Sequence, residues 1–291
     1  MKGMIPFLSV LLPSLALCAQ QTPPQDESVR LKCADYEVVL DASNNWTIKQ
    51  IFFKGEQFLA TEKDAYNGTA VKLADGTWVG DCPGGMSVSS KILSVDGRRK
   101  AVKVGETYTA KKKILFERNC SMKVYRFSGS LEVTPDGLTL VHKYRRTRRD
   151  VPEKLCAFVL CFDKRFRLFI AQIPGKGRDD VMAKRYDGMF YDNETTLIQE
   201  DIRYFALFDT LIHTGVVCYF GGKDCYFYRG EGECCCLRDM GNYRRFHFRP
   251  AIERNPRARE KLEFVLHIKV FQCPTGKWKK TAATIAGSDW R

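Results

Sequence analysis

The segment YRFSGSLEVTPDGLTLVHKY, residues 125–144, contains the clearest structural signal in the chain. Two runs rich in aromatic and aliphatic residues, Tyr125–Val133 and Leu138–Tyr144, flank the tetrapeptide Thr134-Pro135-Asp136-Gly137. Pro presets the φ angle of a turn and Gly accepts a positive φ, so the tetrapeptide predicts a tight connection. The segment therefore predicts an antiparallel hairpin near the middle of the chain.

Runs with a similar period-two pattern occur on both sides of this hairpin. They predict strands at Tyr36–Leu40, Trp46–Phe53, Lys113–Arg118, Leu155–Phe162, Arg203–Phe208, Val216–Phe220, Cys225–Arg229, Tyr243–Arg249 and Leu262–Phe271. Helical periodicity is confined to a short tail at Trp278–Ile285. About a dozen strands without a long helix predict an all-β fold, a large antiparallel β-sandwich with little helix.

The first residues, MKGMIPFLSVLLPSLALCAQ, have the features of a cleaved secretory signal. Lys2 precedes an apolar run that is too short to span a bilayer and is broken by prolines. We expect a signal peptide at 1–19, a linker at 20–30 and a single domain at 31–291, in a secreted or periplasmic protein. Lipoprotein anchoring at Cys18 is the alternative, and it is disfavoured because Leu17 is not a small residue.

The net charge of +13 is concentrated in one stretch of the chain. Residues 98–149 contain fifteen Lys and Arg but four acidic residues, a net charge of +11. A basic protein invites nucleic acid as a partner, but the export signal and the lack of a nucleic-acid-binding motif argue against it. An acidic carbohydrate polymer satisfies the same electrostatics outside the cell. The sequence leaves open whether Lys111-Lys112-Lys113 and Arg145–Arg149 line a groove or coat a rim.

Eleven cysteines remain when Cys18 is set aside with the signal, and an odd number leaves at least one thiol without a partner in the chain. Cys234-Cys235-Cys236 with Cys225 lacks the paired spacings of zinc sites, so we expect no metal and no cofactor. In a strand, Cys235 faces opposite to its two neighbours. One disulfide from this run to Cys225 or Cys273 is the preferred prediction.

Three acidic residues, Asp187, Asp192 and Glu194, lie close together in a region that reads as a loop. Their spacing does not match the calcium-binding loop of an EF-hand. We therefore expect a solvated acidic loop.

The order of these features resembles the galactose-mutarotase-like β-supersandwich, in particular secreted bacterial proteins of that fold. The opening hairpin leads into Lys54-Gly55-Glu56-Gln57-Phe58-Leu59, which looks like the first strand and turn of the family. Phe116–Ser121 followed by the 125–144 hairpin looks like its central sheet. Arg203–Asp209 and then Thr214-Gly215-Val216-Val217 resemble its late strand pair. The likeness covers roughly residues 31–285.

This resemblance implies a protein that interacts with carbohydrate. The fold includes sugar epimerases, polysaccharide-lyase domains and non-catalytic modules, so the fold alone does not determine the function. We expect a secreted protein that binds or processes an acidic polysaccharide. A non-catalytic cell-envelope scaffold or protein-interaction module is the alternative.

Strand alternation defines two candidate binding faces. The first consists of Leu138, Leu140, His142, Tyr144, Arg146 and Arg148, and the second of Tyr243, Arg245, His247 and Arg249, with Phe246 and Phe248 behind it. Arg donates bidentate hydrogen bonds to carboxylate or sulfate, and aromatic rings stack on sugars. We predict substrate contacts for Tyr144, Arg146, Arg245 and Arg249, and expect the two faces to meet in one cleft. An ordinary solvated sheet face is the competing interpretation.

The catalytic candidates are Tyr243, His247 and His142. In a polysaccharide lyase, Arg245 or Arg249 would neutralise the uronate carboxylate, and Tyr243, Tyr144 or His247 would remove the proton at the sugar C5. Mutarotases of the family use a His acid and a Glu base, for which His142 or His247 and Glu263 are the candidates. A buried structural role is the competing interpretation for His142, because leucines share its face.

Overall fold

The computed structural model describes residues 27–173, 185–200, 202–221, 235–257 and 259–287. In these residues, all strands pair antiparallel except β1 (Ser28–Cys33) with β9 (Thr107–Ala110), which are parallel. The α-helix α1 (Trp278–Ile285) follows a short 3-10 turn, Thr275–Lys277. The predicted all-β fold and tail helix are confirmed. The signal at 1–19 with Cys18 and the strand at Cys225–Arg229 lie outside the described residues. No described helix has the length and apolar character that a membrane span needs.

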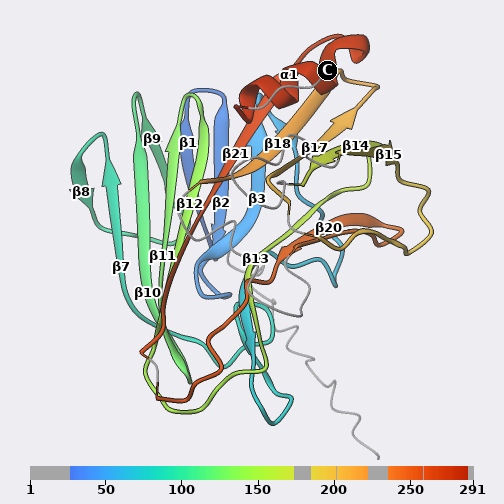
Figure 1. Ribbon diagram of the computed structural model, residues 1–291. Coiled ribbons are helices and arrows are strands. Elements are labelled where there is room, and N and C mark those ends of the chain that lie inside the picture. Colours follow the sequence, from blue (N-terminus) through green and yellow to red (C-terminus); the bar gives the residue numbers. More distant parts are fainter. Residues whose placement is uncertain (1–26, 174–184, 201, 222–234, 258, 288–291) are drawn as a thin grey trace, which may run out of the picture.

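The largest sheet has ten strands in the order β15-β14-β17-β18-β21-β12-β11-β10-β7-β8 (Figure 1). Its strands are β7 (Ser87–Val95), β8 (Arg98–Lys100), β10 (Ile114–Met122), β11 (Tyr125–Thr134), β12 (Gly137–Arg146), β14 (Leu168–Gln172), β15 (Arg185–Met189), β17 (Tyr204–Asp209), β18 (Thr214–Gly221) and β21 (Lys261–Gln272). The hairpin predicted from residues 125–144 is β11–β12, near the middle of this sheet. Its turn closes at Gly137, whose φ of 141° suits glycine.

Two smaller sheets pack against one face of the large sheet. The five-stranded sheet has the order β4-β3-β2-β1-β9 and adds β2 (Tyr36–Asp41), β3 (Thr47–Phe53) and β4 (Glu56–Gln57). The six-stranded sheet has the order β16-β19-β20-β13-β5-β6, with β5 (Gly68–Lys72), β6 (Trp78–Gly80), β13 (Lys154–Asp163), β16 (Thr196–Ile198), β19 (Cys235–Asp239) and β20 (Tyr243–Phe248).

The folded region begins before the predicted boundary at residue 31. Ser28 and Val29 are buried at the start of β1, where they pair with Asp41 and Leu40. The polar residues around Ser28 resemble a linker in the sequence, but strand pairing with β2 satisfies their backbone groups. The predicted linker at 20–30 therefore extends too far.

The main hydrophobic core lies between the ten-stranded sheet and the two smaller sheets. Phe116 of β10 packs near Trp46, and His142 of β12 stacks on Phe158 of β13. The opposite, outer face of the ten-stranded sheet is covered by α1 only over β17, β18 and the end of β21, where Trp278 stacks on Phe208 (Figure 1). The half of the outer face formed by β7, β10, β11 and β12 carries no helix among the described residues, and it bears the candidate site.

Candidate functional site

A shallow groove of about 890 Å³ runs over the outer face of the ten-stranded sheet. Alternation along the strands explains its polar lining, because every second residue of β7, β10, β11, β12 and β21 points away from the core. The polar side chains lining it are Ser89, Ser90, Asn119, Ser121, Arg126, Ser128, Lys143, Arg145, Lys261 and Glu263. Asn119 donates a 3.0 Å hydrogen bond to Ser90 across two strands. We call this surface the outer groove.

A second groove of about 610 Å³ lies at the end of the sheet where β12 finishes. It is lined by seven arginines and by Thr147 and Pro256, with no acidic residue: Arg126, Arg145, Arg146, Arg148, Arg149, Arg257 and Arg259. We call it the arginine groove. Arg126 and Arg145 line both grooves, so the two form one continuous surface.

Arg146 fixes the loop that forms the far wall of the arginine groove. Its side chain is buried, and its two terminal nitrogens donate to the carbonyls of Glu253 and Asn255 at 2.8 and 3.0 Å. The Arg146 N–H donates to the carbonyl of Glu260 at 3.0 Å. The predicted substrate contact of Arg146 is therefore replaced by a positioning role, because its guanidinium holds the loop that carries Arg257 and Arg259.

Glu260 anchors the same loop from its other end. Its buried carboxylate accepts a 2.6 Å hydrogen bond from the Tyr125 hydroxyl and a 2.5 Å bond from the N–H of Glu253. Burial and the neighbouring Glu260 carboxylate raise the pKa of Tyr125, so its hydroxyl remains a donor.

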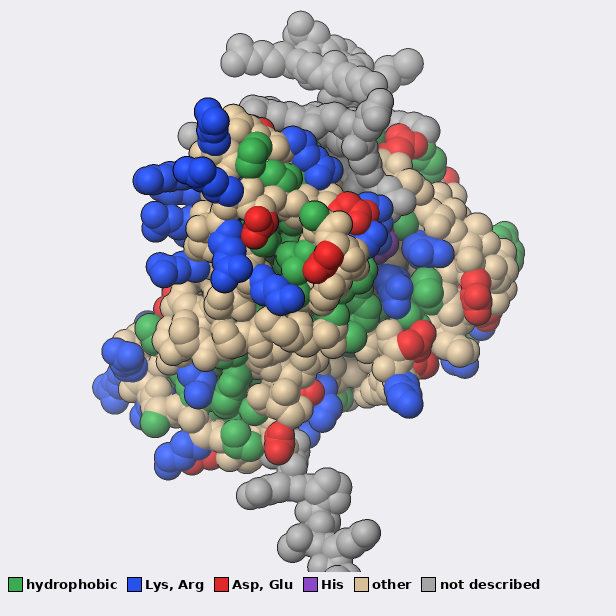
Figure 2. All heavy atoms as spheres, turned by 90° about the horizontal axis from the view of Figure 1, so that it is seen from below, with side chains coloured by type: hydrophobic (Ala, Val, Ile, Leu, Met, Phe, Trp, Pro, Cys, Tyr) green, Lys and Arg blue, Asp and Glu red, His purple; other side chains and the backbone are tan. Residues whose placement is uncertain are grey.

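The other arginines of this groove have no carboxylate partner in the described part of the chain. Within the described residues, the side chains of Arg126, Arg145, Arg148, Arg149, Arg257 and Arg259 form no ion pair with any carboxylate. In Figure 2, which shows this end of the molecule from below, Lys and Arg side chains gather along one side with few acidic groups among them. The outer groove is more balanced, since Lys143 pairs with Glu263 at 3.2 Å.

The two basic runs of the sequence lie at opposite ends of the ten-stranded sheet. Lys111, Lys112 and Lys113 precede β10, and their backbone N–H groups donate to Asp96 at 2.8–2.9 Å. The opposite end of β10 lies beside Arg126, about 23 Å further along the strand. Arg145–Arg149 line a groove, whereas the lysine run coats a rim.

His142 and Tyr144, two of the predicted site residues, are buried in the core. The Nδ1–H of His142 donates to the carbonyl of Ala157 at 2.6 Å, and the Tyr144 hydroxyl lies 2.7 Å from the Thr69 hydroxyl. Burial lowers the pKa of His142 to about 3 and raises the pKa of Tyr144 well above its usual value. Both residues belong to the structural core, which is the competing interpretation stated for His142.

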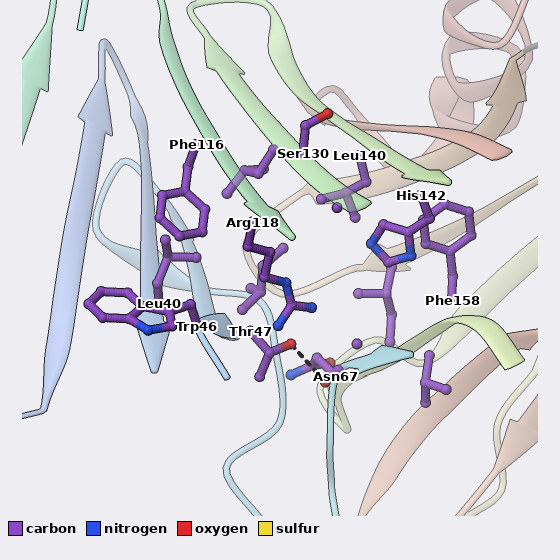
Figure 3. A pocket seen from close by; sticks show the side chains of 16 residues that line it. Leu40, Trp46, Thr47, Asn67, Phe116, Arg118, Ser130, Leu140, His142 and Phe158 are labelled. Carbon is purple, nitrogen blue, oxygen red and sulfur yellow. Dashed lines mark hydrogen bonds between the residues drawn. The ribbon is translucent and has the colours of Figure 1, made fainter. Parts of the chain in front are cut away.

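A small cavity of about 40 Å³ lies beside His142 and is lined in part by Arg118 (Figure 3). Arg118 donates two hydrogen bonds to the buried carboxylate of Asp81, at 2.7 and 2.9 Å. Glycine at position 68 is required, because a Cβ there would lie 2.2 Å from the Asp81 carboxylate. The cavity has room for a few water molecules and is too small for a sugar ring.

Tyr243, Arg245 and His247 lie on the other side of the six-stranded sheet, away from the main core. Tyr243 packs in a separate cluster with Val159 and Cys161 of β13. The prediction that Phe246 and Phe248 back this face is confirmed, since both belong to the main core.

The prediction that the two candidate faces meet in one cleft is wrong. His142 stacks on Phe158, whereas His247 pairs across the strands with Val159, which points to the opposite side of β13. The six-stranded sheet therefore separates the predicted catalytic residues His142 and His247. The lyase candidates Tyr243, Arg245 and His247 therefore share one face, whereas the candidates His142 and Tyr144 are separated from them.

The remaining catalytic candidate, Glu263, is also isolated from these histidines, because it lies in the outer groove beside Lys143. His267 shares its face of β21, but the two are four residues apart, about 13 Å along the strand. His267 contacts the Thr139 hydroxyl at 3.0 Å and stacks on Tyr219.

The structure excludes one of the two disulfides predicted for the cysteine run, the one to Cys273. Cys235 and Cys273 carry free thiols, so no disulfide joins the cysteine run to Cys273. Cys225 and Cys234 lie outside the described residues.

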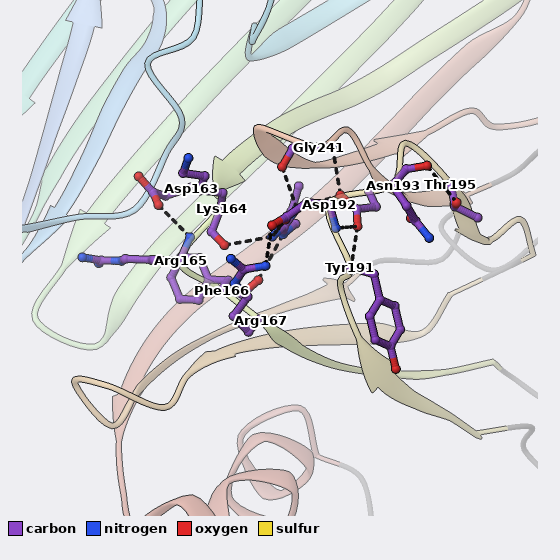
Figure 4. Close-up of polar contacts among 12 residues, drawn as sticks. Asp163, Lys164, Arg165, Phe166, Arg167, Tyr191, Asp192, Asn193, Thr195 and Gly241 are labelled. Atoms are coloured by element: carbon purple, nitrogen blue, oxygen red, sulfur yellow. Dashed lines mark hydrogen bonds and ion pairs between the residues drawn. The ribbon is translucent and has the colours of Figure 1, made fainter.

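The acidic loop near residue 190 has a structural role. The fully buried guanidinium of Arg244 donates to Asp192 at 2.6 Å and to Asp239 at 2.7 Å, and Arg167 also binds Asp192 (Figure 4). The hydrogen bond from Arg244, and to a smaller extent the one from Arg167, holds the pKa of Asp192 below its usual value. Asp192 is exposed, so the expectation of a solvated loop holds, and its two ion pairs in addition anchor the loop. Among the described residues, no group of three or more His, Cys, Asp or Glu side chains is arranged to hold a metal.

The sequence matches no protein-family model, and no curated protein is significantly similar to it. Several solved structures are similar in fold. An α-N-acetylgalactosaminidase from Bifidobacterium bifidum has 8% identity and a TM-score of 0.51, over 89% of this chain and 39% of that one. The Slr1438 protein from Synechocystis has 11% identity and a TM-score of 0.50, over 87% and 98%. A galactose mutarotase-like protein from Clostridium acetobutylicum has 12% identity and a TM-score of 0.49, over 84% and 95%. At these identities the likeness concerns architecture alone, and the chain has the galactose-mutarotase-like fold.

Proposed function

We propose that this protein binds an acidic polysaccharide along the continuous surface formed by the outer groove and the arginine groove. The observation that carries the proposal is a set of six arginines that form no ion pair with any described residue, around a groove that has no acidic lining. Uncompensated positive charge at a concave surface attracts polyanions and raises their rate of association. Arginine in particular offers bidentate donors to carboxylate and sulfate groups.

The shape and chemistry of the outer groove favour a polymer of sugars over another polyanion. The groove is open to solvent along its length. It presents hydroxyl and amide side chains such as Ser90, Asn119 and Ser128. These groups exchange hydrogen bonds with sugar hydroxyls in either direction. The arginine groove continues from it, so a chain lying along both surfaces would place its carboxylates or sulfates at the arginines. The signal sequence expected at residues 1–19 would bring the protein to the compartment where such polymers occur.

The proposed activity is binding without cleavage. In the outer groove, the carboxylate of Glu263 is paired with Lys143, and Tyr144 contributes to the lining while its hydroxyl is bonded to Thr69 in the core. General acid–base catalysis on a glycan needs two such groups within hydrogen-bond reach of one sugar. The described part of the grooves does not bring an acid and a base together in that way.

The test is a panel of polysaccharides incubated with the pure protein at low ionic strength. We expect retention of polygalacturonate, alginate or chondroitin sulfate, no retention of neutral dextran, and no new unsaturated sugar ends by ultraviolet absorbance. Unsaturated ends would instead establish a lyase. Failure to retain any acidic polymer would overturn the proposal and favour a scaffold that acts through protein contacts.

A further inference from the structure

On the outer face of the six-stranded sheet, three buried nitrogens have no hydrogen-bond partner among the described residues. They are the Nε of Arg238, the Nε of Arg245 and the Nε2 of His247. His247 is only 4% exposed, so water does not compensate freely for the missing bond. Buried polar groups in folded proteins nearly always have a partner, so three such donors on one face favour a ligand that accepts hydrogen bonds there. The three donors belong to neighbouring positions on one face of the sheet.

Strand pairing explains why these donors lie together. Arg238 of β19 is the direct cross-strand partner of Arg245 of β20. His247 follows two residues after Arg245 and points to the same face. Direct partners in an antiparallel pair have Cβ atoms about 5 Å apart, and the next residue on the same face lies about 7 Å away. A group the size of a carboxylate or sulfate spans such distances.

Arg245 is held in place by several contacts of its guanidinium. A terminal nitrogen donates to the hydroxyl of Tyr243 and to the carbonyl of Asp64, and the group lies over the rings of Tyr66 and Tyr243 at 5.4 and 5.3 Å. Arg238 forms no ion pair in the part of the chain that the structure describes. The donors are thus preorganised, and the positive charge around His247 is not neutralised by a described carboxylate.

The charges around His247 favour an anion at this point. Burial and the charges of Arg249, Arg245 and Arg238 lower the pKa of His247 to about 3, so the ring is neutral at physiological pH. A neutral imidazole donates one hydrogen bond through Nε2 when its proton is placed there. An anion at this point would accept that bond and offset the repulsion among the arginines.

We propose that Arg238, Arg245 and His247 form a binding site for one small oxyanion, the chemical class of sulfate, phosphate and the carboxylate of a uronic acid. The site is separate from the grooves of the proposed function, because it lies on the outer face of the six-stranded sheet and they lie on the outer face of the ten-stranded sheet. It takes a single charged group, whereas the grooves accommodate a chain. The two proposals therefore succeed or fail independently.

The experiment follows the ring signals of His247 by NMR in the full-length protein during separate titrations with sodium sulfate, sodium phosphate and sodium galacturonate, at constant pH and ionic strength. The chain has four histidines, and the variant His247→Gln identifies the signal. We expect saturable shifts of His247 with at least one anion, and the effective anion shows which source the site prefers. Absence of a saturable shift with all three would overturn the proposal.

The variant Arg238→Gln should weaken binding about tenfold, because one charged donor is lost. Arg238→Lys keeps the charge but removes the Nε donor, so it serves as the second variant if the first does not fold, and it should also weaken binding. The matched control is Arg257→Gln/Arg259→Gln, which removes positive charge from the arginine groove and should leave the His247 titration unchanged. Equal effects of the control and of Arg238→Gln would show a general charge effect and refute the site.

Discussion

The hydroxyl of Tyr125 donates a 2.6 Å hydrogen bond to the buried carboxylate of Glu260, and so joins the start of β11 to the residue before β21. Together with the two bonds from Arg146 to the carbonyls of residues 253 and 255, this contact fixes a surface loop to the end of the hairpin. The positions of Arg257 and Arg259 opposite Arg145–Arg149 depend on these buried contacts.

Removal of the Arg146 contacts should loosen the arginine groove. We expect Arg146→Gln to lower the free energy of unfolding by about 2 kcal/mol, because two carbonyls lose charged donors. Hydrogen exchange of residues 253–257 should accelerate more than that of the β11–β12 hairpin, and the affinity for acidic polysaccharide should fall. Urea unfolding and exchange measured by mass spectrometry check this, and unchanged exchange of the loop would contradict the positioning role.

The buried neutral His142 should make the fold sensitive to acid. Its pKa in the folded protein is about 3, against a usual value of 6.5. Below pH 6.5 the unfolded chain therefore binds a proton that the folded protein does not, so stability is complete above pH 6.5 and falls as the pH drops toward 3. Each pH unit within that window costs about 1.4 kcal/mol for this histidine.

The variant His142→Gln removes this titration. We expect the variant to be less stable than the wild type at pH 7. Between pH 6 and pH 4, however, its free energy of unfolding should decrease less steeply than that of the wild type, with a slope that is smaller by about 1.4 kcal/mol per pH unit. His247 has the same depressed pKa and continues to titrate in the variant, so part of the acid sensitivity remains. Denaturant unfolding at several pH values measures the slopes, and identical slopes in the two proteins would exclude the assignment.

The Arg118–Asp81 pair should show strong coupling between its partners. Asp81→Asn leaves the buried Arg118 charge uncompensated and should cost about 3–5 kcal/mol. The double variant Asp81→Asn/Arg118→Met removes both charges and should recover part of that loss, because an apolar side chain fills the space without a desolvated ion. A double-mutant cycle of unfolding free energies checks this, and purely additive effects would contradict the pairing.

The sequence was sufficient to predict the β-strands, but not which strands lie opposite each other across the core. Period-two alternation and the turn at 134–137 predict the β11–β12 hairpin correctly, and alternation places Phe246 and Phe248 behind the face of His247. Alternation cannot show which sheet lies across the core from a given strand. That information was missing when His142 and His247 were expected to share a cleft.

The arginine groove was only half visible in the sequence. Arg145–Arg149 form an evident basic run, but the opposite wall comes from Arg257 and Arg259, more than a hundred residues later, and depends on the buried contacts of Glu260. A signal for the buried Arg118 was available, because it alternates with Phe116 and Cys120 on one face of β10. A charged residue on an apolar face requires a buried partner, which here is Asp81.

The central claim is that an acidic polysaccharide binds at the arginine groove and not through the net charge of the whole protein. Two double variants remove the same charge from opposite ends of the ten-stranded sheet, Arg257→Gln/Arg259→Gln in the groove and Lys111→Gln/Lys112→Gln at the rim. Both pairs are exposed, so neither change should affect folding.

The decisive measurement is the affinity of these variants and of the wild type for polygalacturonate, by isothermal titration calorimetry at two salt concentrations. We predict that the groove variant binds about fivefold to thirtyfold more weakly, at about 0.5–1 kcal/mol for each arginine, and depends less on salt. The rim variant should bind within about twofold of the wild type. Equal losses in the two variants, or no loss in the groove variant, would contradict the account.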